Sequence, residues 1–197
     1  LPPALVLGPV HHRVTTWART RHGSTRGHLI AILDSARYLA LLDSLDALLA
    51  TPPLRAKAAA KPGKALAKAV RKDFAKVSRL TTGALDLPPG EQRDLALHEA
   101  RKKAKRTRYA AEAVTPALGG PARALTKSMK SLTSLLGDHQ DSVMARRTLR
   151  ELSAVAHAAG ENAFTYGLLH GREEARAEAV ETKLPGLWRE ITSRGSV

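Results

Sequence analysis

The segment 98–109 carries the densest group of side chains able to bind a charged ligand, and it reads H-E-A-R-K-K-A-K-R-T-R-Y. At about 100° per residue, one side of an α-helix would carry six of them: His98, Arg101, Lys102, Lys105, Arg108 and Tyr109. Arginine binds two oxygens at once, lysine supplies a mobile ammonium group, and histidine donates further hydrogen bonds. Because the segment would rise about 16 Å along a helix, the spacing predicts a site for a chain of anionic groups.

The same pattern has a second interpretation, a solvated basic face that binds nothing. Like charges one helical turn apart cost roughly a few tenths of a kcal/mol per pair, so a stripe without counter-charges favours binding. Lys103 and Arg106 are expected on an intermediate face. Small side chains on the remaining face predict close packing against a neighbouring helix: Ala100, Ala104, Thr107 and Ala111.

Two further groups of basic residues are candidates for the same ligand. Lys127 and Lys130 lie on the helix expected next in the chain, whose polar side is mixed. The middle of the chain predicts a helix with a basic side, for which a solvated face is nearly as good an interpretation; this side consists of Lys64, Lys68, Arg71 and Lys72.

Three residues of the segment 138–141 are expected to have supporting roles. Asp138 and Asp141 are poor contacts for an anion, but they are expected to orient cations of the 98–109 segment through ion pairs. By helical geometry His139 falls toward the apolar side, which predicts a packed, hydrogen-bonded histidine more than a ligand.

Composition limits the class of protein. The chain has 197 residues, 43% of them hydrophobic and only 4% aromatic, which favours an aliphatic helical bundle. It has no cysteine, which excludes disulfides and thiolate zinc sites and suits the cytoplasm. No stretch is apolar enough to cross a bilayer. The formal net charge of +14 would attract nucleic acid, polyphosphate or anionic lipid.

Helical periodicity runs through the chain, and no segment alternates as a strand would. The segment 28–49 is expected to form two helices that meet at Asp34, with Asp34-Ser35 as the cap. Pro116 and Gly119-Gly120-Pro121 are together expected to end the helix that carries the stripe. Gly137 is expected to mark a bend or a close contact. The other expected helices are 64–81, 91–114, 122–158 and 163–180, with a short apolar tail at 184–191.

Two motifs in this order resemble the CHAD domain, the conserved histidine α-helical domain: the segment 98–109 and the segment 135–141, which reads L-L-G-D-H-Q-D. The segment 28–54 is similar to the central part of that family and 164–188 to its end. The resemblance implies an all-α fold of two antiparallel helical bundles related by internal duplication, and binding of inorganic polyphosphate without catalysis. The family's first basic helix has no counterpart here, so the first bundle is expected to be incomplete. The whole chain, 1–197, is expected to form one such domain with sub-halves 1–90 and 91–197.

Three classes of function are therefore considered. The leading hypothesis is binding of inorganic polyphosphate, with association with polyphosphate granules in the cytoplasm and no cofactor. The second is binding of other polyanions such as nucleic acid, although zinc-finger and basic-zipper patterns are absent from the sequence. The third is a phosphoacceptor at His98 or a metal site that uses His98 and His139, without the compact H-E-x-x-H spacing of a zinc enzyme. The pattern does not specify an oligomeric state.

Overall fold

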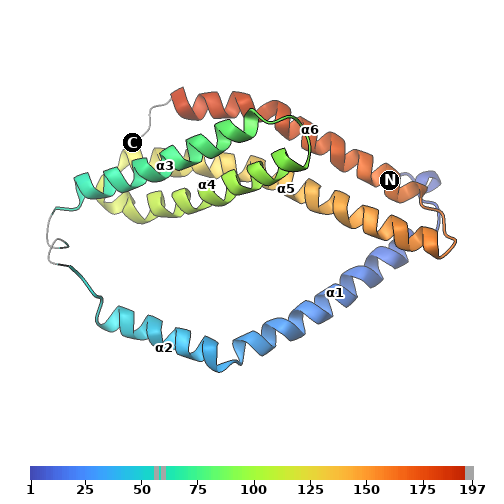
Figure 1. The fold of residues 1–197 in the computed structure, drawn as a ribbon, viewed down its shortest axis with the longest axis horizontal. Coiled ribbons are helices and arrows are strands. Elements are labelled where there is room, and N and C mark those ends of the chain that lie inside the picture. Colours follow the sequence, from blue (N-terminus) through green and yellow to red (C-terminus); the bar gives the residue numbers. More distant parts are fainter. Residues whose placement is uncertain (56–57, 59–60, 194–197) are drawn as a thin grey trace. The chain divides into compact units, whose positions relative to one another are not determined.

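Helices dominate the computed structural model, which describes residues 1–55, 58 and 61–193. A short 3₁₀ helix, η1, spans Pro3–Leu5. It is followed by α1 (Val10–Leu33), α2 (Ala36–Ala50), α3 (Gly63–Leu85), α4 (Glu91–Leu118), α5 (Gly120–Ala158) and α6 (Phe164–Ser193), as Figure 1 shows. No strand occurs within the described ranges. The expected all-α class is confirmed.

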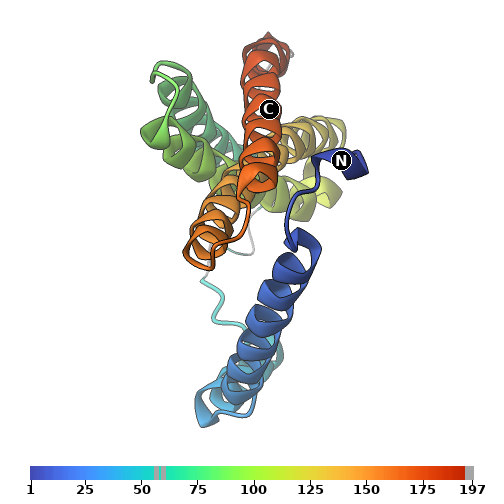
Figure 2. The same ribbon diagram turned by 90° about the vertical axis from the view of Figure 1, so that its right-hand side faces the viewer.

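The helices group into two compact units, and each is described by itself. The α3–α6 unit comprises Lys61–Ser153 and Tyr166–Val197, and the α1–α2 unit comprises Leu1–Ala60 and Ala154–Thr165. These units do not follow the expected sub-halves 1–90 and 91–197, because α3 is grouped with α4. Figures 1 and 2 both place α3 beside α4.

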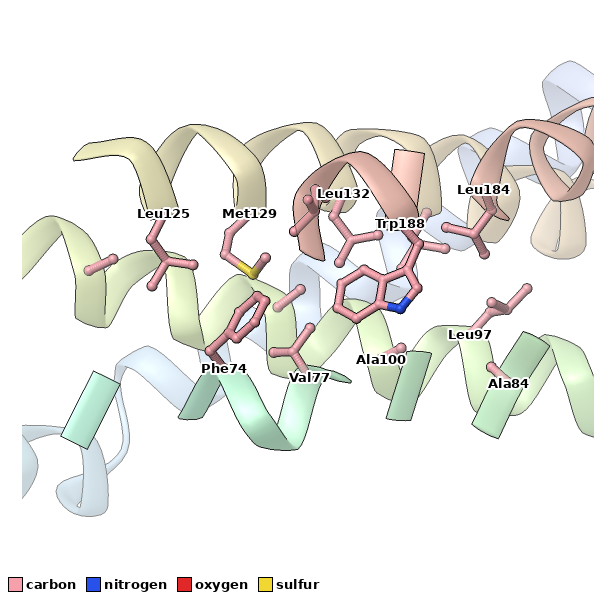
Figure 3. Close-up of a cluster of buried hydrophobic side chains, with 14 of the residues drawn as sticks. Phe74, Val77, Ala84, Leu97, Ala100, Leu125, Met129, Leu132, Leu184 and Trp188 are labelled. Carbon is pink, nitrogen blue, oxygen red and sulfur yellow. The ribbon is translucent and has the colours of Figure 1, made fainter. Parts of the chain in front are cut away.

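Four helices share one core in the α3–α6 unit. Helix α3 has apolar side chains at helical spacing, and it buries Val70, Phe74, Val77, Thr81 and Ala84. Helix α4 contributes small residues, so its backbone approaches its neighbours closely. Figure 3 shows side chains from all four helices pointing toward one another, and the rings of Phe74 and Trp188 lie 6.1 Å apart between centroids. This core holds α4 in a fixed orientation.

Two prolines lie inside helices of the α3–α6 unit. The expected end of the helix that carries the stripe falls at Gly119 and not at Pro116. Helix α4 continues through Pro116 to Leu118 and ends at Gly119, which has a φ of 64°. Pro185 lies inside α6, so the predicted separate tail at 184–191 is wrong. A proline in a helix interior costs about 3 kcal/mol, but here Leu184, Trp188 and Ile191 are all buried on one face. Burial of that face offsets the lost hydrogen bond.

In the α1–α2 unit, the predicted break at Asp34 is confirmed. The Ser35 hydroxyl accepts a hydrogen bond of 3.2 Å from the backbone N–H of Tyr38 and caps α2. Near the start of the chain, Arg13 donates two hydrogen bonds of 2.6 and 2.7 Å to Glu161, which lowers the pKa of that carboxyl. The apolar side chains of α1 and α2 remain largely exposed, since Val10 is the one buried residue described in these two helices.

Within residues 1–55, 58 and 61–193, no helix is both long enough and apolar enough to cross a bilayer.

Candidate anion-binding site

Helix α4 has a packed face and a basic edge next to it. Ala100, Ala104, Thr107 and Ala111 are fully buried, which confirms the expected packed face. Six residues, which we call the α4 stripe, lie beyond it, some half-buried and some exposed: His98, Arg101, Lys102, Lys105, Arg108 and Tyr109. The stripe therefore begins at the margin of the core and extends into solvent.

Arg101 lies against the neighbouring helix α5. A Cβ atom built on Gly137 would lie 3.6 Å from Arg101 Nε and 3.7 Å from Nη2, so the guanidinium group rests on the α5 backbone. Gly137 therefore faces Arg101 of α4 with room for a contact of ordinary van der Waals length, and the expectation of an unusually close contact there stays a prediction. Within the described residues, Arg101 Nε and His98 Nδ1 are buried and make no hydrogen bond. An anionic oxygen at this edge would supply the acceptor that a buried N–H donor requires.

Tyr109 lies at the far end of the stripe between two cations. Tyr109 is 49% exposed. The Arg108 guanidinium carbon lies 4.8 Å and Lys105 Nζ 6.0 Å from the centroid of its ring. These distances are within the range of cation–π attraction. The ring holds both cations on the same side of α4. Arg108 also faces Glu112, with Nε and Oε1 3.7 Å apart.

Two lysines of the segment have acidic partners. Lys102 donates a hydrogen bond of 2.6 Å to Glu99, and this bond lowers the pKa of the Glu99 carboxyl. Lys103 bonds to Asp73 of α3 at 2.5 Å, so it ties two helices of the bundle together. Arg101 and Lys105, in contrast, form no ion pair with any described residue. They are the cations best placed to receive an external anion.

The two α5 lysines lie about 60° apart around that helix and have different surroundings. Lys130 precedes Gly137 by seven residues, two helical turns, and so lies on the face of α5 that meets α4. Lys127 instead lines a hollow between α5 and α6 together with Leu187, Glu190 and Ile191. Lys130 lies on the side of the stripe, whereas Lys127 lies beside α6.

The four basic residues of α3 are also separate from the stripe. Lys64, Lys68, Arg71 and Lys72 are exposed, and none of them forms an ion pair in the described part of the chain. On the helix they lie on the side away from Asp73, the residue through which α3 is bonded to α4. They form an independent basic face.

A cluster of charged side chains that the sequence did not predict joins three helices. His139 of α5 is 1% exposed, and its Nε2 atom lies 3.4 Å from Oδ1 of Asp94 on α4 and 3.2 Å from Oε1 of Glu181 on α6. The other oxygen of each carboxylate faces an arginine: Arg146 Nη2 is 3.3 Å from Asp94 Oδ2, and Arg93 Nε is 3.2 Å from Glu181 Oε2. The expected packed histidine is confirmed, but neither its two carboxylate partners nor the two arginines that face them carried a signal in the sequence.

Asp94, His139 and Glu181 are also the group whose spacing suits a metal ion, with one donor atom each within 4.8 Å of the others. However, two carboxylates and two arginines already balance in charge when the imidazole is neutral. A divalent ion would add two uncompensated charges to a partly buried site, which is costly. We therefore interpret the cluster as an ion network that joins α4, α5 and α6. His98 does not belong to it.

Asp138 does not orient the stripe as expected. Its Oδ1 atom accepts a hydrogen bond of 3.0 Å from Arg176 of α6, so the Asp138 carboxylate pairs with α6 and not with a cation of α4. The expectation for Asp138 was wrong because periodicity alone does not tell which neighbouring helix lies on a given side.

Comparison with known proteins gives a family and two relatives. The family model described as the CHAD domain matches residues 1–150. Two curated proteins of Mycobacterium tuberculosis, "Uncharacterized protein MT2285" of strain CDC 1551 / Oshkosh and "Uncharacterized protein Rv2226" of strain ATCC 25618 / H37Rv, are each 36% identical over 191 residues. The match covers 97% of this chain and 36% of each relative, so the chain spans about a third of their length. No solved structure matches.

Proposed function

The chain belongs to the CHAD domain family, and we propose that it binds inorganic polyphosphate along the α4 stripe. The proposal is of a binding protein without a catalytic step or a cofactor. In the cell, such binding would bring the protein to polyphosphate granules. Family membership supports the ligand class, and the stripe supports the place.

The observation that carries the proposal is that Arg101 and Lys105 lie one helical turn apart with no carboxylate partner among the described residues. Arg108 and His98 continue the row in both directions, so that the donors follow one line along α4. Successive phosphoryl groups of an extended chain present oxygens at repeated intervals, and a row of donors matches such a ligand better than a single phosphate. The net charge of +14 adds long-range attraction.

Nucleic acid is the second candidate because of Tyr109. An exposed aromatic ring beside cations is the arrangement on which single-stranded bases stack. The rest of the stripe, in contrast, consists of histidine, arginine and lysine side chains, which bind phosphate without requiring a base, and it has no asparagine or glutamine to pair with an adenine edge. We therefore rank polyphosphate first.

Competition between the two polymers tests this order. Protein held on immobilised polyphosphate is expected to stay bound when duplex or single-stranded DNA is added at the same phosphate concentration. Affinity for polyphosphate should fall linearly with salt on a double logarithmic plot, since bound counterions are released. Release by DNA at equal phosphate concentration would reverse the ranking, and retention without salt dependence would contradict an electrostatic site.

A phosphoacceptor at His98 is the third candidate and has its own test. Because His98 is half-buried beside Arg101, we expect it to donate to phosphate rather than to attack it. Incubation with a labelled phosphodonor should leave no acid-labile label on the chain. Label that disappears in His98→Gln would establish the phosphoacceptor instead.

A further inference from the structure

Gly137 lies in the middle of α5, where glycine costs about 1 kcal/mol relative to alanine. Its backbone does not require glycine, since the described glycines with positive φ are Gly8, Gly90, Gly119 and Gly160. What a small residue can provide here is instead the space that a side chain longer than alanine would occupy.

That space borders Arg101. Among the glycines described within α1 to α6, Gly137 is the one whose added Cβ would meet other atoms within 4 Å, and both atoms belong to the Arg101 guanidinium. Added at Gly83, Gly167, Gly171 or Gly186, a Cβ would meet nothing within 4 Å. Gly137 of α5 and Arg101 of α4 therefore face each other where the two helices meet.

We propose that Gly137 is a positioning residue for the anion site: because it carries no long side chain, the Arg101 guanidinium can lie against α5, where its direction toward a bound phosphoryl group is fixed. The inference rests on the proposed function and identifies a residue on a second helix that the ligand itself need not contact. A fixed guanidinium loses less side-chain entropy when it binds than a mobile one.

The effect should depend on side-chain size. The Cβ of Gly137→Ala would stand 3.6 Å from Arg101 Nε, an ordinary van der Waals distance, so this variant should bind polyphosphate like the wild type. Gly137→Met extends three further heavy atoms into the place of the guanidinium and should displace it. We expect Gly137→Met to weaken binding about tenfold, the loss of one charge-assisted hydrogen bond.

A ligand-free measurement separates this proposal from the proposed function. In ¹H–¹⁵N spectra, the Nε–Hε signal absent from Arg101→Ala identifies Arg101. It should keep its position in Gly137→Ala and move in Gly137→Met. Gly83→Met on α3 is the matched control, since it places the same side chain in open space, and it should change neither this signal nor binding. An unmoved Arg101 signal in Gly137→Met would overturn the positioning role even if polyphosphate binds.

The effect on polyphosphate affinity is tested with a double-mutant cycle of Gly137→Met and Arg101→Ala. If Gly137 acts through Arg101, Gly137→Met should cause no further loss in the Arg101→Ala background. An equal loss in both backgrounds would overturn the proposal. A wild type that binds no polyphosphate would refute the proposed function, and the role of Gly137 would then be decided by the spectra.

Discussion

Replacing Arg101, Lys105 and Arg108 together with alanine is expected to weaken polyphosphate binding by about a hundredfold or more at low salt. Arg101 and Lys105 have no acidic partner among the described residues, and Arg108 lies 3.7 Å from its own, so little compensating charge is released when they are removed. The slope of log affinity against log salt should become shallower by about 2, as three phosphate contacts are lost from a single-stranded polyanion. Titration of fluorescently labelled polyphosphate at several salt concentrations measures both quantities.

The chain provides a control with the same change in charge. Alanine at Lys64, Lys68 and Arg71 also removes three cations, but from the independent basic face of α3. If the α4 stripe is the site, this variant should lose only the small part of affinity that comes from net charge. Equal losses in both triple variants would show that polyphosphate is attracted by overall charge and that the stripe is not a site. Circular dichroism should show the same helix content in both.

Much of the α4 stripe was predictable because it depends on local geometry. A helix of period 3.6 fixes which residues share a side, so the separation of Ala100 and Ala104 from Lys102 and Lys105 followed from spacing alone. Propensity and turn signals likewise gave the break at Asp34. The proline signal failed at Pro116, where α4 continues to Leu118 and ends at Gly119. At Pro185, burial of Leu184, Trp188 and Ile191 outweighs the local preference of proline.

Relations between helices were not predictable in the same way. Periodicity placed His139 on an apolar side, but nothing in the spacing of Asp94 and Glu181 shows that they meet there from two other helices. The different surroundings of Lys127 and Lys130 have the same cause, because the two lie on neighbouring parts of one helix face and spacing alone does not show where the adjacent helix α6 begins to cover it. That Gly137 lies beside Arg101 could likewise be learned only from the positions of both helices.

Replacing His139 with alanine is expected to destabilise the α3–α6 unit by about 3 kcal/mol. The change removes a side chain that is 1% exposed, leaves a cavity, and deprives the inner oxygens of Asp94 and Glu181 of their shared partner. Urea unfolding followed by Trp188 fluorescence measures the loss, in a Trp17→Phe background so that the signal reports this unit alone. Met144→Ala, at an exposed position of α5 in the same unit, should change stability by only about 0.5 kcal/mol.

A cavity alone would also destabilise the bundle, so the ion network needs a test of coupling. Glu181→Gln keeps the size of the side chain but leaves Arg93 without its carboxylate, and it should be destabilising by itself. In a double-mutant cycle, His139→Ala and Glu181→Gln should be coupled by about 1 kcal/mol or more, since each removes part of one interaction. Strict additivity would show that His139 stabilises the unit only by filling space. Coupling would show that α4, α5 and α6 are joined by charge at one end of the same helix that carries the stripe.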